Sequence, residues 1–293
     1  MSMISQLRRA GGASKPPIAL VYGKPGIGKT TFAASAPGAV FVQTEDGLTN
    51  PALSDIPTFG VQSSYEGVMS CFEAIAQNKD EYGFKTVVID GVDRLIAPLM
   101  TQYVCAQNGW ATLEDGAYGK GKTALVAEGR NFMDCLIALR NECGLGIIML
   151  AHHKAVRVSP PDSDPYTQYN LAIAEDMARI FIGDSDMVLF ATHPVSTSST
   201  DAGFKKKFTR ATIDKPRVYT RERGSHIAKN RFDMPEFMPF EWTTVSKYIP
   251  AWNGAEQPEH IAAYIAAQPA QPVTDEGDPV DVAETAGEQI GAE

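Results

Sequence analysis

The segment GKPGIGKT, residues 23–30, has the residue types and the spacing of a phosphate-binding loop. It fits the pattern G-x-x-x-x-G-K-[ST], follows the apolar run IALVY (18–22) and precedes the helix-forming run KTTFAAS. Its glycines would let backbone N–H groups reach phosphate oxygens, and the start of the helix adds partial positive charge. The alternative is a glycine-rich turn that binds nothing. The residues predicted to bind the nucleotide are Gly23, Lys24, Pro25, Gly26, Ile27, Gly28, Lys29, Thr30 and Thr31.

The motif also assigns roles to individual side chains. We expect Lys29 to reach the β- and γ-phosphates of ATP and the Thr30 hydroxyl to bind Mg²⁺. Asp90 ends the apolar run KTVVI (85–89), which suits a carboxylate that orders the same ion, although an aspartate there could also cap a helix. In many nucleotide hydrolases a glutamate follows directly and activates the attacking water. Here the next residue is Gly91, so the base is either absent or lies elsewhere.

Glu45 is the candidate for that base. It lies two residues beyond the apolar run AVFVQ (39–43), in the segment TEDGL. Because the carboxyl ends of parallel strands meet at the ligand-binding edge of a sheet, we expect Glu45 near the γ-phosphate. A carboxylate placed there can orient and deprotonate water. The alternative is an acidic turn without catalytic function.

The elements that must position these residues alternate between strands and helices. Helices are predicted over 64–77 and 123–143, and the apolar runs between them predict a buried, mostly parallel sheet. After residue 191 the pieces are shorter and more polar, which predicts antiparallel strands at one edge. The fold class is therefore α/β. Strands are predicted at 18–22, 39–43, 85–89, 145–151 and 187–191.

Composition limits the organisation of the chain. Of its 293 residues 44% are hydrophobic, enough for a packed core, and no run approaches the roughly 18 apolar residues that span a membrane. The four cysteines lack CxxC spacing, which predicts reduced thiols, no metal site and a cytoplasmic protein, and the N-terminus lacks the apolar run of a signal peptide. We predict a flexible segment 1–15, one domain over 16–250 and an acidic, largely disordered tail over 251–293, with a short helix around EHIAAYIAA.

The net charge of −9 comes from that tail. Nine carboxylates lie between Glu256 and Glu293, and no lysine or arginine follows Lys247. Without the nine, 26 acidic residues remain against 26 basic ones. An acidic balance argues against general nucleic-acid binding, but a neutral body can still carry a local basic patch.

Two segments together resemble the RecA-type ATPases. AVFVQTEDGLTNP followed by FKTVVIDGVDRL is similar to that family's strand–glutamate segment followed by its aspartate strand. The resemblance implies that Glu45 is the catalytic base, and the missing glutamate after Asp90 argues against the AAA+ class, whose base usually lies there. The likeness covers residues 16–242 and is strongest to phage-encoded RecA-like single-strand annealing proteins. No tyrosine follows TEDGL at the place where the bacterial recombinase stacks adenine, so the base preference stays open.

The resemblance extends to two later segments. GIIMLAHHK places His152 where RecA relatives carry a polar residue that senses the γ-phosphate, although a histidine satisfied within the core is the simpler interpretation. HIAKNRFDMPEFMPFEW resembles the family's late Lys-Asn-Lys/Arg motif. By that likeness Lys229 and Arg231 would complete the ATP site of a neighbouring subunit. By itself, KNR is a common solvated turn.

Two loops are candidates for binding single-stranded DNA. Segment 108–122 offers Lys120 and Lys122 beside Trp110 and Tyr118, and segment 152–169 offers His153, Lys154 and Arg157 beside Tyr166. Cations among aromatic side chains suit single strands, whose phosphates need charge and whose bases need a stacking face. The alternative is that both are solvated loops. A third basic patch, FKKKFTR (204–210), could equally be an edge strand protected by lysines.

These observations predict a RecA-like core that binds and hydrolyses ATP with Mg²⁺ and binds single-stranded DNA in recombination or strand annealing, in a phage-encoded protein. A homo-oligomeric ring or filament is expected, with a single-strand-binding protein as a further candidate partner and no membrane. One alternative is a hexameric helicase-like motor. Another is an ATP-dependent switch protein that recruits a partner through its acidic tail without binding DNA.

Overall fold

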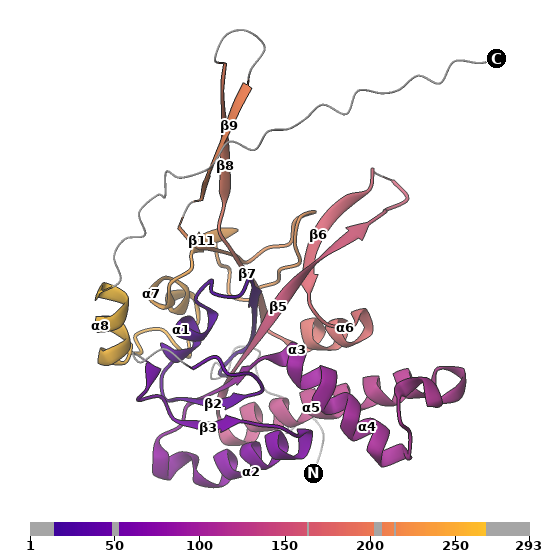
Figure 1. Ribbon diagram of the computed structural model, residues 1–293. Helices are drawn as coiled ribbons and strands as arrows, with labels where there is room; N and C mark the ends of the chain where they lie inside the picture. The colour runs from indigo at the N-terminus through magenta and orange to yellow at the C-terminus, as the bar shows by residue number, and fades with distance from the viewer. Residues whose placement is uncertain (1–14, 49–52, 163, 202–206, 214, 268–293) are drawn as a thin grey trace, which may run out of the picture.

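The computed structural model describes residues 15–48, 53–162, 164–201, 207–213 and 215–267 (Figure 1). Its centre is a nine-stranded sheet in the order β11-β10-β7-β1-β5-β4-β2-β3, with β6 paired to β5 alone. Six strands are parallel, and β10 and β11 add antiparallel pairs at one edge. The predicted α/β fold class is confirmed. The strands of this sheet are β1 (Ile18–Gly23), β2 (Ala39–Gln43), β3 (Thr58–Val61), β4 (Thr86–Asp90), β5 (Gly146–Val158), β6 (Tyr166–Leu171), β7 (Met187–Thr192), β10 (Arg217–Tyr219) and β11 (Phe237–Pro239).

Helices cover both faces of the sheet, as a parallel sheet requires. The larger helices end at glycines in the left-handed region, Gly83 after α2 and Gly144 after α5. The helices are α1 (Lys29–Ala34), α2 (Tyr65–Tyr82), α3 (Val92–Arg94), α4 (Thr101–Asn108), α5 (Lys120–Cys143), α6 (Glu175–Asp184), α7 (Trp242–Val245) and α8 (Glu259–Ala267), with helical turns η3 (Leu95–Met100), η4 (Leu113–Asp115), η5 (Ala117–Gly119) and η6 (Ser246–Tyr248).

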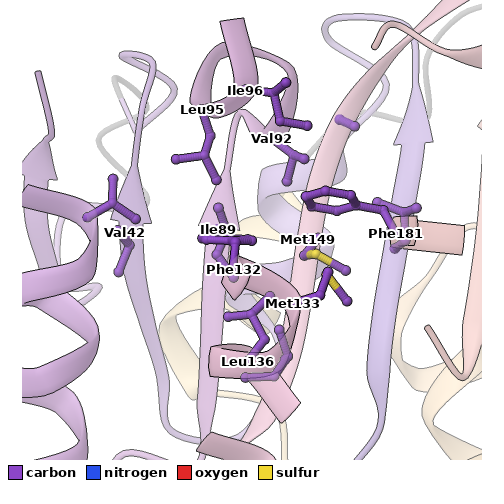
Figure 2. Packing of buried hydrophobic residues seen from close by; sticks show 14 of the residues in the cluster. Val42, Ile89, Val92, Leu95, Ile96, Phe132, Met133, Leu136, Met149 and Phe181 are labelled. Atoms are coloured by element: carbon purple, nitrogen blue, oxygen red, sulfur yellow. The ribbon is translucent and has the colours of Figure 1, made fainter. Parts of the chain in front are cut away.

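Alternate residues of the parallel strands build two separate cores. Side chains such as Val42, Ile89 and Met149 pack against α2, α5 and α6, where Phe132 and Phe181 fill the layer (Figure 2). The intervening side chains pack against α1, α7 and α8 on the opposite face. Because both faces are buried, the strands are continuous apolar runs, and this explains why the sequence predicted them well.

Two β-hairpins extend away from the body (Figure 1). β5 leaves the sheet after about half its length, and its second half pairs antiparallel with β6. β8 (Val195–Asp201) follows β7 and pairs with β9 (Lys207–Ile213). Both begin at the carboxyl ends of parallel strands, so they stand at the edge of the sheet that carries the phosphate-binding loop.

The structure corrects several local predictions. Segment 152–169 is not an irregular loop, because residues 152–158 extend β5 and 166–169 belong to β6. Segment 108–122 contains η4, η5 and the first turn of α5, which starts at Lys120 and not at residue 123. The sequence analysis also missed β3, α4 and α6; β3 is a largely exposed edge strand and therefore lacks a long apolar run.

The region after residue 250 begins as part of the folded body. Trp252 and Ile261 are buried in the core on the side of the sheet that α1 and α7 cover. Ile261 belongs to α8, which is the helix predicted from EHIAAYIAA. Residues 1–14 and 268–293, which hold most of the two predicted flexible segments, lie outside the described residues, as does 204–206 of the third basic patch. No described helix is long and apolar enough to cross a membrane. All four cysteines are free, as predicted.

Candidate active site

The phosphate-binding loop joins β1 to α1 in the conformation that its glycines allow. Gly26 and Gly28 have φ angles of 75° and 99°, which a residue with a side chain rarely adopts. Lys29 is 8% exposed, and its ammonium donates hydrogen bonds to the carbonyls of Gly23 (3.2 Å) and Lys24 (3.0 Å). Burial lowers the pKa of Lys29, and the charge of Asp90 opposes that shift. The lysine is therefore folded over the loop, where its ammonium would face a bound phosphate.

Thr30 and Asp90 form a pair of oxygen ligands beside the loop. The Thr30 hydroxyl donates to Oδ2 of Asp90 at 3.2 Å. Asp90 is 3% exposed, and burial, with the charge of Glu45 second, raises its pKa to about 6. A hydroxyl and a buried carboxylate are ligands that Mg²⁺ prefers, and the ion would stabilise the ionised carboxylate. The two residues therefore fit the predicted Mg²⁺ site.

Glu45 lies against the position that follows Asp90. Thr44 donates its backbone N–H to the Asp90 carbonyl (2.9 Å) and its hydroxyl to the Gly91 carbonyl (2.6 Å), which binds the end of β2 to the end of β4. A Cβ atom on Gly91 would lie 2.6 Å from the Thr44 hydroxyl oxygen and 3.1 Å from Cγ of Glu45. Gly91 also has a φ of 100°. A glutamate at residue 91 would therefore collide with the Glu45 segment, whose own carboxylate lies beside Asp90.

This crowding gives the first testable prediction. Gly91→Ala is expected to lower the free energy of unfolding by about 1–3 kcal/mol, because a side chain is strained at this φ and meets Thr44 and Glu45. Urea denaturation measures the loss. Gly183→Ala is the matched control, since that glycine lies in α6 with no neighbour within 4 Å of a new Cβ. Equal stability of the Gly91→Ala variant and the wild type would show that the segment is not constrained as described.

His152 is held between two carboxylates at the end of the sheet portion of β5. Its backbone N–H donates to Oδ1 of Asp93 at 3.0 Å, and its ring Nδ1 lies 3.0 Å from Oδ2 of the same residue. Its Nε2 faces Oε1 of Glu45 at 3.9 Å. Arg94 approaches the other oxygen of Glu45, with 3.6 Å between Nε and Oε2. The interpretation of His152 as a simple core histidine does not fit, because the side chain is partly exposed and faces Glu45.

Asp93 and Arg94 were missed by the sequence analysis. A signal was present, because these two charged residues follow the buried strand β4 within four positions of Asp90. Residues of α3 directly after the Asp90 strand must lie near the same edge of the sheet. The partner of Asp93 lies 59 residues later in the chain, and the partner of Arg94 lies 49 residues earlier. The position of the two residues after β4 does not indicate either partner.

Lys229 and Arg231 lie apart from the loop and have partners within their own chain. Lys229 pairs through its backbone with Val188 and donates from Nζ to the carbonyls of Ile182 (3.0 Å) and Gly183 (2.8 Å) in α6. Arg231 binds Asp186, with 2.9 Å between Nη1 and Oδ1. Both residues line a surface hollow of about 560 Å³ that contains no residue of the phosphate-binding loop. The segment HIAKNRF is one of the polar pieces after residue 191 for which antiparallel edge strands were predicted, and it forms isolated bridges and no regular strand.

The predicted DNA-binding cations of β5 do not share one face. Successive residues of a strand point to opposite sides, so His153 and Arg157 lie on one face of the hairpin and Lys154 on the other. Lys154 donates to the Ile173 carbonyl at 2.6 Å, and the His153 ring packs edge-on against Tyr169. Arg157 and Tyr169 are exposed. The face of Arg157 therefore combines a cation with an aromatic ring.

The other predicted cations lie in the first turn of α5. Lys120 is exposed, and Lys122 forms an ion pair of 2.5 Å with Asp176 of α6. Tyr118, directly before them, is fully exposed in the left-handed region with a φ of 56°. All three side chains are exposed, and the ion pair with Asp176 distinguishes Lys122 from Lys120.

Comparison with known proteins adds a family. A family model described as an AAA domain matches residues 15–232. Among solved structures, the crystal structure of the RadB recombinase is similar at 15% identity and a TM-score of 0.39, with 69% of this chain and 90% of that chain covered. Likeness at this level says nothing about function. No match was found among curated proteins.

Proposed function

The chain belongs to the AAA domain family, and on that premise we propose that it binds ATP with Mg²⁺ and hydrolyses it with Glu45 as the general base. The observation that supports this proposal is the common edge at which Lys29, Thr30, Asp90 and Glu45 meet. Lys29 is charge-coupled to Asp90 and Glu45, and Thr30 is bonded to Asp90. These are the groups needed to hold phosphates, order a metal ion and deprotonate water.

The glycine after Asp90 is a departure from the AAA+ class, whose base usually follows that aspartate. The match to a family model described as an AAA domain supports a P-loop ATPase and does not decide between the RecA-type and AAA+ classes. A side chain at residue 91 would meet the Glu45 segment, which lies directly alongside Gly91. The proposal therefore takes the catalytic carboxylate from the end of the neighbouring strand β2.

The proposed reaction is an in-line displacement at the γ-phosphate. The water oxygen forms a new P–O bond as the bond to the bridging oxygen breaks, ADP leaves, and Glu45 takes a proton from the water. Lys29 would offset phosphate charge, and Mg²⁺ bound by Thr30 and Asp90 would supply further positive charge. The test is phosphate release by the wild type and by Lys29→Ala, with ATP affinity measured by calorimetry. Equal phosphate release by both proteins would refute the assignment.

We further propose a RecA-like role, in which the protein assembles as a ring or filament and binds single-stranded DNA in recombination or strand annealing. A phage origin, with action in the host cytoplasm, belongs to the same proposal. The exposed face of the β5–β6 hairpin, with Arg157 and Tyr169, supports the DNA-binding part. Stimulation of ATP hydrolysis by single-stranded DNA tests it. Hydrolysis without any response to DNA would favour the switch protein that recruits a partner.

The two faces of the hairpin make DNA binding testable by single substitutions. Arg157→Ala is expected to reduce the slope of log affinity against log salt by about 0.7, the value for one phosphate contact on a single strand. Lys154→Ala is the matched control, because this residue is three positions away, lies on the opposite face and is bonded to the Ile173 carbonyl. Fluorescence anisotropy with a labelled oligonucleotide at several salt concentrations measures both. A reduced slope for Lys154→Ala alone would assign DNA to the other face.

A further inference from the structure

Asp93 contacts His152 through both of its carboxylate oxygens. Oδ1 accepts the backbone N–H of His152 and Oδ2 lies 3.0 Å from ring Nδ1. The Asp93 side chain is 17% exposed and that of His152 is 24% exposed, so solvent competes little with either contact. An ionised carboxylate can only accept hydrogen bonds, which assigns the proton of this contact to Nδ1 of His152.

This proton fixes the role of the other ring nitrogen. In a neutral imidazole with the proton on Nδ1, Nε2 is an acceptor. Nε2 lies 3.9 Å from Oε1 of Glu45, which is too far for a direct hydrogen bond and suits a bridging water. Arg94 lies at the second oxygen, Oε2, so the two oxygens of Glu45 have different neighbours. A water between Nε2 and Oε1 would donate one O–H to each.

We propose that Asp93 is a positioning residue for hydrolysis: through the proton on Nδ1, it makes His152 Nε2 and Glu45 Oε1 a pair of acceptors that hold the attacking water. With both O–H bonds committed, a lone pair of the water oxygen remains for the γ-phosphate. When the new P–O bond forms and the bond to the bridging oxygen breaks, the proton facing Glu45 passes to that carboxylate and the other proton stays on the phosphate. This inference rests on the proposed ATP hydrolysis.

Asp93→Asn changes which ring nitrogen of His152 carries the proton, while the side chain at residue 93 keeps nearly the same shape. The amide oxygen can still accept the backbone N–H of His152, which leaves the amide NH₂ facing Nδ1. Nδ1 must then accept, and the imidazole proton moves to Nε2, where it faces Glu45. In the nucleotide-free protein, ¹⁵N NMR of the His152 ring should show a protonated Nδ1 in the wild type and a protonated Nε2 in the variant. An unchanged tautomer would overturn the proposal.

The kinetic measurement tests the consequence. Asp93→Asn is expected to reduce kcat by on the order of 10- to 100-fold, the size of effect seen when a metal-binding histidine loses its carboxylate partner, with ATP affinity unchanged. Asp80→Asn is the control, because that carboxylate is 91% exposed and remote from this cluster. In a His152→Gln background the Gln amide has no tautomer, so Asp93→Asn should cause no further loss.

The possible failures are distinct. A full additional loss in the His152→Gln background would mean that Asp93 supports the fold and not the His152 proton, which overturns the proposal. Wild-type kcat in Asp93→Asn would overturn it as well. If the unsubstituted protein releases no phosphate above the Lys29→Ala level, the proposed function itself fails, and this is seen before any change at Asp93.

Discussion

Replacing Lys229 and Arg231 together by alanine is expected to lower ATP turnover by on the order of 10³-fold or more while ATP still binds. The γ-phosphate gains charge in the transition state that one lysine and one Mg²⁺ would offset only in part, and in the proposed assembly a cation from an adjoining subunit would supply the rest. Both residues line a surface hollow that is separate from the loop of their own chain, a location compatible with action on a neighbour. Phosphate release measures ATP turnover, and calorimetry measures ATP binding.

The contacts of both residues within the chain require a control for folding. Arg231 binds Asp186, and Lys229 donates to two carbonyls at the end of α6. Loss of a cation at a helix C-terminus typically costs about 0.3–1 kcal/mol, so thermal unfolding should change little. Arg179→Ala is the matched variant, because this arginine belongs to α6, the helix that Lys229 contacts, and pairs at the surface with Glu175. A loss of turnover with Arg179→Ala as large as that of the double variant would identify damage to α6 as the cause.

Mixing the double variant with Lys29→Ala decides whether the two residues act between subunits. Each protein retains what the other lacks, so mixed assemblies should contain some complete interfaces and regain part of the activity. A mixture that co-assembles and stays inactive would exclude action between subunits. Full activity of the double variant alone would remove the RecA-like assignment of this motif.

Glu45→Gln is expected to leave ATP binding intact and to lower turnover by about 10²- to 10⁴-fold, the typical effect of losing a positioned general base. Glutamine has nearly the same shape and can keep the place beside Gly91, but it cannot accept the proton of the attacking water. The neighbouring Asp46 is exposed, and Asp46→Asn is therefore the control for a change of charge in the same turn. Single-turnover phosphate release separates the chemical step from binding.

Two results would contradict this assignment. Turnover of Glu45→Gln within a few-fold of the wild type would mean that another group takes the proton. An equal loss for Asp46→Asn would indicate a general effect of charge in this turn. Glu45→Gln and Asp93→Asn are expected to affect the same water. The loss of turnover in the double variant should therefore be smaller than the sum of the two single losses, expressed as activation free energies.

The sequence by itself determined the parallel core and the phosphate-binding loop. Both depend on local properties. Glycines at 26 and 28 permit backbone angles that other residues avoid, and strands buried on both faces must be apolar along their whole length. The order of strands then brings residues at the ends of β1, β2 and β4 to one edge, so Glu45 could be placed near Asp90 in advance.

Elements whose stability depends on distant partners were not determined by the sequence. The second half of β5 is polar and followed by prolines, so it looked like a loop, and only pairing with β6 makes it a strand. That pairing also separates Lys154 from Arg157, since a strand sends residues three apart to opposite faces. A basic segment can be recognised from composition, but its faces depend on the conformation that its partner imposes.

The tertiary structure alone decided the surroundings of the candidate site residues. Asp93 and His152 are 59 residues apart, and Arg231 and Asp186 are 45 apart. Hydrogen bonds and ion pairs of this kind form because the folded sheet and its helices bring side chains within about 3 Å, and no spacing along the chain encodes that approach. The sequence therefore predicted which residues would hold phosphate and take a proton, and the fold determined which neighbours lie against them.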